Sequence, residues 1–267
     1  NHKSENIDEI KGILNDKSVV FLTAGLGGGT GTGSLPVIAE VSKRTGALTI
    51  AIVTMPFTME GKKRYDNAVY GLLKLEKKVD AIIIISNDKL LELYPKLPMK
   101  TTFQLCDKLL TDSINNIIEM ISKPGIVNLD LADLKAVMRD IGYSIVAFGE
   151  GEGLQKSKDC IELALGNPLL DVDINGAMGA LINITGGTDL KLEDAHNVVK
   201  YVMDATGRNA KMKWGVQIDN NLKNKIKVMA IITGIPRQRF EKYFDFESYK
   251  HDYNMDIIPK DVLDITP

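Results

Sequence analysis

The stretch Gly25-Leu-Gly-Gly-Gly-Thr-Gly-Thr-Gly-Ser34 decides the fold, because six of its ten residues are glycine and three carry a hydroxyl group. Before it, residues 19–23 form an apolar run typical of a buried strand. After it, residues 35–42 are predicted to be a helix with a proline in its first turn. This is the layout in which backbone N–H groups and a helix start can face a phosphate. A flexible loop is the alternative, but the two strong flanking elements favour an anion-binding loop.

Two widespread phosphate-binding motifs do not fit this stretch. A Walker-type loop needs a lysine followed by serine or threonine after its last glycine, and Gly33 is followed by serine and leucine. A dinucleotide fingerprint has the form G-x-G-x-x-G, which Gly29 and Gly31 begin, but position 34 is serine. The next predicted strand, residues 50–54, also ends without an acidic residue that would hold a ribose. These departures argue against a nucleotide-dependent oxidoreductase and indicate a phosphate loop of another kind.

Composition bounds the class of protein. The 267 residues are 44% hydrophobic and 25% charged, which is typical of one large or two ordinary globular domains. The net charge of −2 argues against a general nucleic-acid binder, and no apolar run approaches the roughly 18 residues of a membrane span. Cys106 and Cys160 are expected to be reduced, as in the cytoplasm. The histidines, His2, His196 and His251, have no metal-ligand spacing, so no protein metal site is expected.

The first hundred residues alternate between helices and apolar strands. The strands are expected at residues 19–23, 47–54 and 81–86. Strands that are apolar throughout are buried on both faces, which indicates a parallel α/β sheet. A long helix with one apolar stripe follows at residues 101–122 and ends at Lys123-Pro-Gly125.

Past residue 142 the pattern becomes that of an α+β domain. Strands are expected at 143–149, 179–185, 213–218 and 226–234, with helices at 154–165 and 191–204. Only a polar turn separates the last two strands, which suggests that they pair with each other as an antiparallel hairpin. Beyond residue 236 the chain mixes aromatic and charged residues and is predicted to be a tail, partly helical at most.

Four motifs, in this order, resemble those of the FtsZ/tubulin superfamily, and of FtsZ in particular. Residues 27–33 resemble its signature glycine loop, and Pro56-Phe-Thr-Met-Glu-Gly61 is similar to its sugar-contacting loop. Asn128-Leu-Asp-Leu-Ala-Asp133 resembles its catalytic loop, and residues 167–173 resemble a segment of its C-terminal domain. The resemblance implies a Rossmann-like parallel-sheet GTPase domain, a long central helix, and a second α+β domain with a four-stranded sheet.

The resemblance also implies where the domains begin and end. The expected parts are a nucleotide-binding domain at 1–100, the central helix at 101–122, the catalytic loop and its following helix at 123–142, the C-terminal domain at 143–235, and a tail at 236–267. FtsZ proteins carry a further strand and an earlier glycine-rich loop before this point. We therefore expect a chain truncated at its front, whose GTPase domain is incomplete and which alone binds GTP weakly or not at all and is inactive.

The nucleotide-binding residues follow from the matched motifs. GTP or GDP would be held by Gly28, Gly29, Thr30, Gly31, Thr32, Gly33, Glu60, Arg64, Asn87, Phe103 and Asp107. The glycine stretch would cradle the outer phosphates, Glu60 would accept from the ribose, and Arg64 would bridge phosphate and sugar oxygens. Phe103 would stack on the guanine, while Asp107 and Asn87 would read its edge. From spacing alone, Glu60 and Arg64 also fit an ordinary surface ion pair. Asp107 also fits a solvated helix residue, and Asn87 a turn residue.

The catalytic residues implied by the resemblance are Asn128, Asp130 and Asp133, which would orient and activate the attacking water. The alternative from the residues alone is a capping box that starts the next helix, with Asp130 as its N-cap. A helix of this length, at 1.5 Å per residue, separates Phe103 from Asp130 by about 30 Å. The carboxylates would therefore act on a neighbour's nucleotide, a head-to-tail contact that builds filaments.

The function expected from the resemblance is that of a GTP-hydrolysing filament protein of cell division, cytoplasmic and located at the mid-cell ring. A tubulin-like structural paralogue without useful hydrolysis, for instance in shape control, is the alternative. Mg²⁺ would accompany the nucleotide without a dedicated protein ligand. The partners would be further copies of the chain and, through an apolar and acidic stretch at residues 255–264, a membrane adaptor or division protein.

Overall fold

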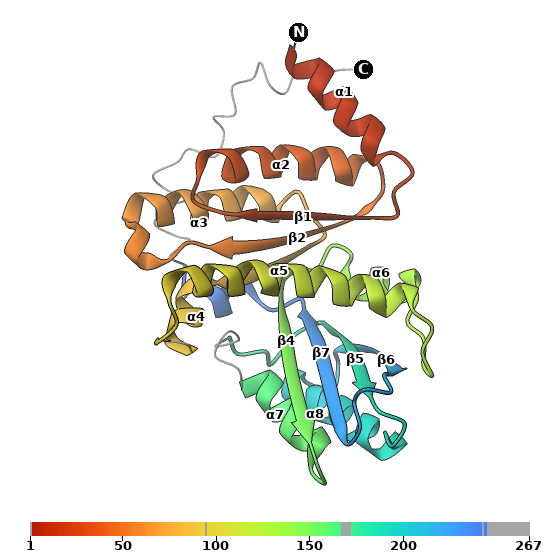
Figure 1. Ribbon diagram of the computed structural model, residues 1–267. Helices are drawn as coiled ribbons and strands as arrows, with labels where there is room; N and C mark the ends of the chain where they lie inside the picture. The colour runs from red at the N-terminus through yellow and green to blue at the C-terminus, as the bar shows by residue number, and fades with distance from the viewer. Residues whose placement is uncertain (1, 94, 167–171, 242, 245–267) are drawn as a thin grey trace.

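The computed structural model describes residues 2–93, 95–166, 172–241 and 243–244. Within these residues, the strands form one seven-stranded sheet in the order β1-β2-β3-β4-β7-β5-β6 (Figure 1). The strands are β1 (Val19–Gly25), β2 (Leu48–Met55), β3 (Ala81–Ser86), β4 (Gly142–Glu152), β5 (Gly179–Gly186), β6 (Lys211–Ile218) and β7 (Lys225–Thr233).

Helices cover both faces of the sheet. They are α1 (His2–Leu14), α2 (Gly29–Arg44), α3 (Lys62–Glu76), α4 (Asn87–Leu93), α5 (Met99–Ser122), α6 (Leu131–Met138), α7 (Lys156–Gly166) and α8 (Leu192–Thr206), with short 3-10 turns η1 (Thr58–Glu60) and η3 (Arg237–Phe240). Apolar residues of α2, α3, α7 and α8 share one core with one face of the strands, while α5 and α6 pack on the other face. In Figure 1, α5 crosses between the β1–β3 part and the β4–β7 part.

The first half has the expected parallel arrangement. β1, β2 and β3 pair in parallel, and every residue of β2 is buried, which confirms a strand covered on both faces. β3 then pairs in parallel with the first residues of β4, so the two halves share one sheet. Both sulfhydryls, of Cys106 and Cys160, are free and buried.

The expected hairpin between the last two strands is wrong. β6 pairs in parallel with β5, whereas β7 runs antiparallel between β4 and β5. A short polar turn makes pairing of its flanking strands easy, but here β7 contributes a fully buried run, Val228–Thr233, that lies inside the sheet between β4 and β5. Burial of that run between two neighbours therefore decides the order, and β6 is left at the edge.

Three local differences from the sequence expectations also bear on the site. Helix α2 begins at Gly29 inside the glycine stretch, so Pro36 lies two turns into the helix and not in its first turn. Asn87 begins α4, where a turn was also considered. Phe240 and Phe244, placed in the predicted tail, are buried at 2% and 4% exposure. Residues 167–171 of the fourth motif, His251 and residues 245–267 of the tail lie outside the described residues.

Candidate functional site

The glycine stretch forms a tight turn that leads directly into α2. Gly28 is the N-cap in extended conformation, with φ of −82° and ψ of 174°. The hydroxyl of Thr32 accepts a hydrogen bond from the N–H of Gly27 at 2.9 Å, and Ser34 donates to the carbonyl of Thr30 at 2.7 Å. No acidic residue occupies the first turn of α2, and no side chain of the described chain caps its N-terminus. The first N–H groups of the helix are therefore available to an anion.

The start of α3 packs against this turn. A methyl group built on Gly27 would meet the Arg64 carbonyl oxygen at 2.7 Å. Arg64 Nε forms an ion pair with Glu60 Oε2 at 2.9 Å, and Glu60 Oε1 accepts a hydrogen bond from the Phe57 N–H at 2.9 Å. Glu60 is thus held by both neighbours while the Arg64 side chain remains 52% exposed. The surface ion pair considered from spacing exists, and it lies beside the glycine stretch.

The residues predicted to contact a base gather at the same edge of the sheet. Phe103 is 43% exposed, and its ring meets the buried ring of Phe57 edge-on, with centroids 5.2 Å apart. Asp107 follows one turn later on α5 and is exposed. Asn87 is 6% exposed, and its Oδ1 has no hydrogen-bond partner among the described residues. A buried amide oxygen without a partner is costly unless a ligand or water satisfies it.

Sequence reasoning missed the residue that holds this edge together. The carboxylate of Asp88 accepts hydrogen bonds from the N–H and the hydroxyl of Thr58, at 2.9 Å and 2.5 Å. This contact ties the first turn of α4 to η1, which carries Glu60. No local pattern reveals a pair thirty residues apart.

The predicted catalytic loop is held by hydrogen bonds that its own side chains accept. Asn128 Oδ1 accepts a hydrogen bond from the Gly125 N–H at 2.5 Å. Asp130 caps α6: its Oδ1 accepts from the Asp133 N–H at 2.8 Å, and Asp133 Oδ2 accepts from the Asp130 N–H at 3.2 Å. The capping box is therefore present, and it leaves Asn128 and Asp130 exposed.

A cation next to this loop was also missed by sequence reasoning. Lys213 Nζ lies 2.6 Å from Asp133 Oδ1. This hydrogen bond holds the pKa of Asp133 below its ordinary value, and the same contact raises the pKa of Lys213. Lys213 comes from β6, eighty residues after Asp133, so no sequence signal could have found it.

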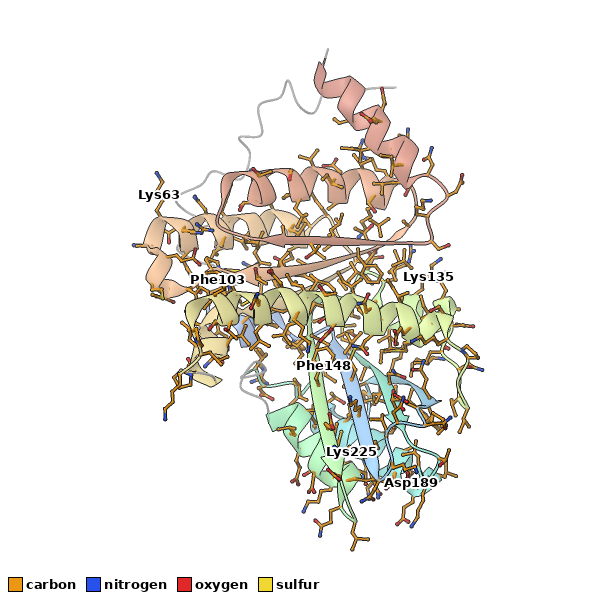
Figure 2. The ribbon with its side chains drawn as sticks, viewed as in Figure 1. Lys63, Phe103, Lys135, Phe148, Asp189 and Lys225 are labelled. Atoms are coloured by element: carbon orange, nitrogen blue, oxygen red, sulfur yellow. The ribbon has the colours of Figure 1, made fainter. Side chains whose placement is uncertain are left out.

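The structure places the two groups of predicted residues at opposite ends of α5. Figure 2 labels Phe103 at one end of this helix and Lys135 of α6 beyond the other end. The 19 residues from Phe103 to Ser122 rise about 29 Å at 1.5 Å per residue. The glycine stretch with Glu60, Arg64, Asn87, Phe103 and Asp107 therefore forms one surface, and Asn128, Asp130 and Asp133 form another that cannot reach it.

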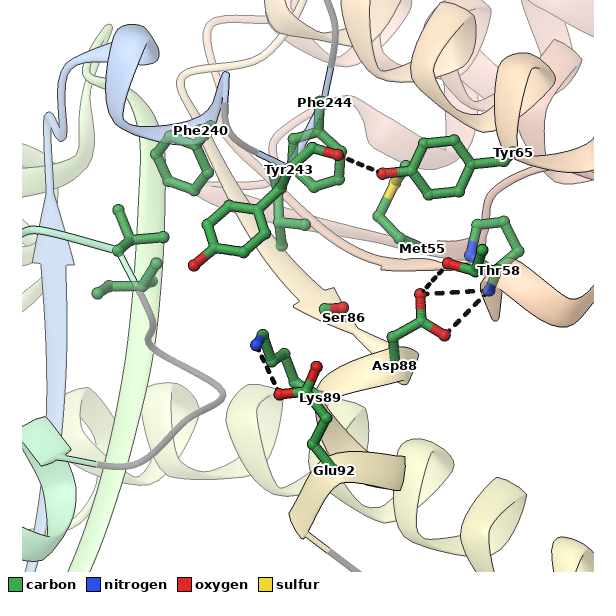
Figure 3. A pocket seen from close by; sticks show the side chains of 14 residues that line it. Met55, Thr58, Tyr65, Ser86, Asp88, Lys89, Glu92, Phe240, Tyr243 and Phe244 are labelled. Atoms are coloured by element: carbon green, nitrogen blue, oxygen red, sulfur yellow. Dashed lines mark hydrogen bonds and ion pairs between the residues drawn. The ribbon is translucent and has the colours of Figure 1, made fainter. Parts of the chain in front are cut away.

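A separate cavity of about 260 Å³ lies where the two halves of the chain meet (Figure 3). None of the predicted site residues lines it. Its walls include Tyr65 of α3 and the aromatic side chains of Phe240, Tyr243 and Phe244, and Tyr65 donates a hydrogen bond to the Tyr243 carbonyl. Burial raises the pKa of Tyr65 to about 12, so its hydroxyl stays protonated.

Among the described residues, no group of three or more His, Cys, Asp or Glu side chains is arranged to hold a metal ion. Within the same residues, no helix is both long and apolar enough to cross a membrane.

Comparison with protein families gives two matches. The Tubulin/FtsZ family GTPase domain matches residues 1–95, and the FtsZ family C-terminal domain matches residues 142–236. Cell division protein FtsZ 1 of Methanocaldococcus jannaschii is 47% identical over 231 residues, which are 86% of this chain and 64% of the relative. Cell division protein FtsZ 1 of Pyrococcus abyssi is 44% identical over 261 residues, which are 98% of this chain and 69% of the relative. The chain thus spans about two thirds of the length of these relatives.

Solved structures agree with these relatives. A structure described as an empty FtsZ dimer from M. jannaschii superimposes with a TM-score of 0.82 at 46% identity, covering 88% of this chain and 68% of that chain. CetZ1 from Haloferax volcanii, as a GDP-bound monomer, superimposes with a TM-score of 0.76 over 93% of this chain and 76% of that chain. Its 19% identity shows a shared fold alone.

Proposed function

The chain belongs to the FtsZ family, and from that premise we propose that its full-length protein binds and hydrolyses GTP and polymerises head-to-tail into filaments for cell division. We propose that it does so in the cytoplasm, at the division ring. The observation that carries this proposal is the separation of two surfaces along one helix: the glycine stretch lies at one end of α5 and the loop with Asp130 and Asp133 at the other.

The glycine stretch fits a nucleotide's phosphates. Methyl groups built on Gly28, Gly29 or Gly33 meet no atom of the described chain within 4 Å, so packing does not explain these three glycines. A phosphate that approaches the backbone closely does explain them, because a side chain would fill the cradle. Thr30 lies in the first turn of α2, where its hydroxyl and the N–H groups of Gly29 and Gly31 can donate to the outer phosphates.

The neighbouring side chains suit the rest of a guanine nucleotide. Glu60 can accept from ribose hydroxyls while Arg64, which it orients, donates to phosphate or sugar oxygens. The exposed ring of Phe103 offers a stacking face, and Asp107 can accept both N–H groups of the guanine edge. Asn87 has a buried oxygen without a partner in the described chain, and the base would supply its hydrogen-bond donor.

Hydrolysis would occur between two subunits. Asp130 and Asn128, exposed at the far end of α5, would orient the attacking water on the nucleotide of the next subunit, with Asp133 holding Asp130 in place. Mg²⁺ would arrive with the nucleotide and neutralise charge on its phosphates, because phosphate oxygens and water are its preferred ligands. A contact between unlike surfaces repeats along one direction and so produces filaments.

The test uses the full-length protein. It should sediment with GTP and not with GDP, and Asp133→Ala should abolish phosphate release while GTP binding persists. Asp204→Ala, an exposed acid on α8, is the matched control and should behave as wild type. Wild-type turnover in Asp133→Ala would remove the catalytic role. Filaments of Asp133→Ala with the same lifetime as wild-type filaments would favour the alternative, a structural filament protein without useful hydrolysis.

Mixing two inactive variants tests the shared site directly. Arg64→Ala damages the nucleotide surface and Asp133→Ala damages the loop, so neither protein should hydrolyse GTP alone. In a mixed filament, an intact nucleotide surface meets an intact loop at about a quarter of random contacts, which should restore up to that fraction of turnover. No recovery, with both variants entering the same filaments, would place the complete site within one subunit.

A further inference from the structure

Lys213 connects the loop that carries the two carboxylates to the C-terminal part of the sheet. Its Nζ lies 2.6 Å from Asp133 Oδ1, while Asp133 Oδ2 accepts the Asp130 N–H at 3.2 Å. Both oxygens of Asp133 are therefore occupied. Asp130 uses only Oδ1, and within the described chain its Oδ2 accepts no hydrogen bond. The two carboxylates are thus not equivalent.

We propose that Lys213 is a positioning residue, which fixes Asp133 as an ionised anchor and leaves Asp130 as the carboxylate that meets the attacking water. This inference rests on the proposed function. Lys213 acts through Asp133 and does not contact the nucleotide.

The backbone around this ion pair distinguishes it from an ordinary surface ion pair, which typically contributes little to stability. The loop before α6 adds to the free edge of β6. The Ile126 N–H donates to the Val216 carbonyl at 2.8 Å, and the Val216 N–H donates to the Val127 carbonyl at 2.9 Å. A methyl group built on Gly215 would touch Leu129 at 3.1 Å. Because both backbones are fixed by these contacts, only side-chain torsions remain to be ordered when the lysine and the carboxylate pair.

The charges that face Asp133 are few. Helix α6 packs against β2, β5 and β6, and neither β2 nor β5 contains a charged residue. From β6 come Lys213 and Lys211, and from the same turn as Asp133 comes Asp130. Lys211 is exposed and forms no ion pair with a described residue. The hydrogen bond from Lys213 lowers the pKa of Asp133, so this carboxylate stays charged when Asp130 takes a proton from water.

The first experiment needs no nucleotide. Carbon-13 NMR titration of the carboxyl of Asp133, assigned with Asp133→Asn, compares wild type with three lysine variants. Lys213→Met should raise the Asp133 pKa towards its usual range. Lys213→Arg, which keeps the charge and a donor, should leave it low, and so should Lys211→Met, which removes an equal charge from the same strand. Thermal unfolding of all three checks that they fold.

The second experiment measures GTP turnover by the full-length protein. Lys213→Met should lower kcat by about tenfold or more, as expected when a proton acceptor is misplaced, with KM unchanged. The acidic limb of its pH–rate profile should move to higher pH. Lys213→Arg should recover most of the rate and Lys211→Met should equal wild type.

The outcomes separate this inference from the function on which it rests. Unchanged titration of Asp133 in Lys213→Met overturns it, and so does an unchanged kcat when Asp133→Ala is inactive. A raised KM with normal kcat also overturns it, because that result means that Lys213 touches the nucleotide. A wild-type protein that does not bind GTP, or an active Asp133→Ala, contradicts the proposed function instead.

Discussion

Gly27 and Arg64 touch with no room for a side chain between them: a methyl group on Gly27 would lie 2.7 Å from the Arg64 carbonyl oxygen and 2.8 Å from its Cγ. Gly27 also has a φ of +100°, a conformation that other residues avoid. This contact sets the glycine stretch against the first turn of α3, beside the ion pair between Arg64 and Glu60. Packing of the chain therefore shapes the surface that we assign to the nucleotide.

Gly27→Ala should destabilise the fold. The substituted residue must keep a left-handed conformation and displace the backbone of Arg64, which together should cost about 1–3 kcal/mol. Urea unfolding followed by the fluorescence of Trp214, the chain's single tryptophan, measures the change in unfolding free energy. An unfolding midpoint equal to that of wild type would mean that the turn relaxes freely.

Gly29→Ala is expected to separate binding from stability. A methyl group at Gly29 meets no described atom within 4 Å, and alanine suits the start of a helix better than glycine does. The free energy of unfolding should stay the same or rise by up to about 1 kcal/mol. GTP binding by the full-length protein, measured by calorimetry, should nevertheless weaken. Unaltered binding would show that no phosphate approaches this part of the cradle.

Asp107→Asn should change which base the full-length protein accepts. In the proposed complex the carboxylate of Asp107 would accept hydrogen bonds from the N1–H and 2-amino groups of guanine, whereas an asparagine presents one acceptor and one donor. Xanthine carries an oxo group at the 2-position, so the variant should prefer XTP to GTP. Competition between the two nucleotides measures this preference. An unchanged preference for GTP would remove Asp107 from base recognition, and Asp112→Asn, five residues further along α5, serves as the control.

Tyr65→Phe should loosen the contact between α3 and the chain after β7. Tyr65 donates a hydrogen bond to the Tyr243 carbonyl, so removing its hydroxyl should lower the free energy of unfolding by about 1 kcal/mol. Tyr201→Phe is the control, because that hydroxyl bonds the exposed Glu162 and its loss should cost less. Equal effects of the two variants would show that the Tyr65 bond contributes no more than a surface one.

The sequence predicts what depends on neighbouring residues. The strand and the helix on either side of the glycine stretch, and the uniformly apolar β2 and β3, are local patterns and are confirmed. The strand before the glycine stretch, β1, was expected to be buried and is only partly so, because it lies at the edge of the sheet. Helix α2 starts earlier than predicted, because tertiary packing overrides the poor helix propensity of Gly29, Gly31 and Gly33. The role of each predicted site residue stays a prediction, although the structure brings those of the nucleotide surface together.

What the sequence does not predict depends on contacts distant along the chain. The ion pair of Lys213 with Asp133 exists only because the loop before α6 joins the edge of β6. The edge of β6 is available to this loop because β7 pairs with β4 and β5, so the expected hairpin between β6 and β7 does not form. The same holds for Phe240 and Phe244, whose aromatic and charged surroundings in sequence resemble a tail although both rings are buried.

The free energy of unfolding should fall at acidic pH, because protonation of Asp140 breaks its ion pair with Lys43. Lys43 Nζ lies 2.6 Å from Asp140 Oδ1, and this hydrogen bond lowers the pKa of Asp140 in the folded state. A carboxyl whose folded pKa is depressed stabilises the fold above its unfolded pKa, and that contribution disappears as pH falls through the folded value. Asp140→Asn should therefore flatten the dependence of the unfolding free energy on pH around and below the ordinary carboxyl pKa of 3.8, by a fraction of a kcal/mol because the side chain is 66% exposed. Urea unfolding at a series of pH values, with Asp159→Asn on α7 as the control, measures the slope. Identical slopes in Asp140→Asn and wild type would show that the pair does not contribute.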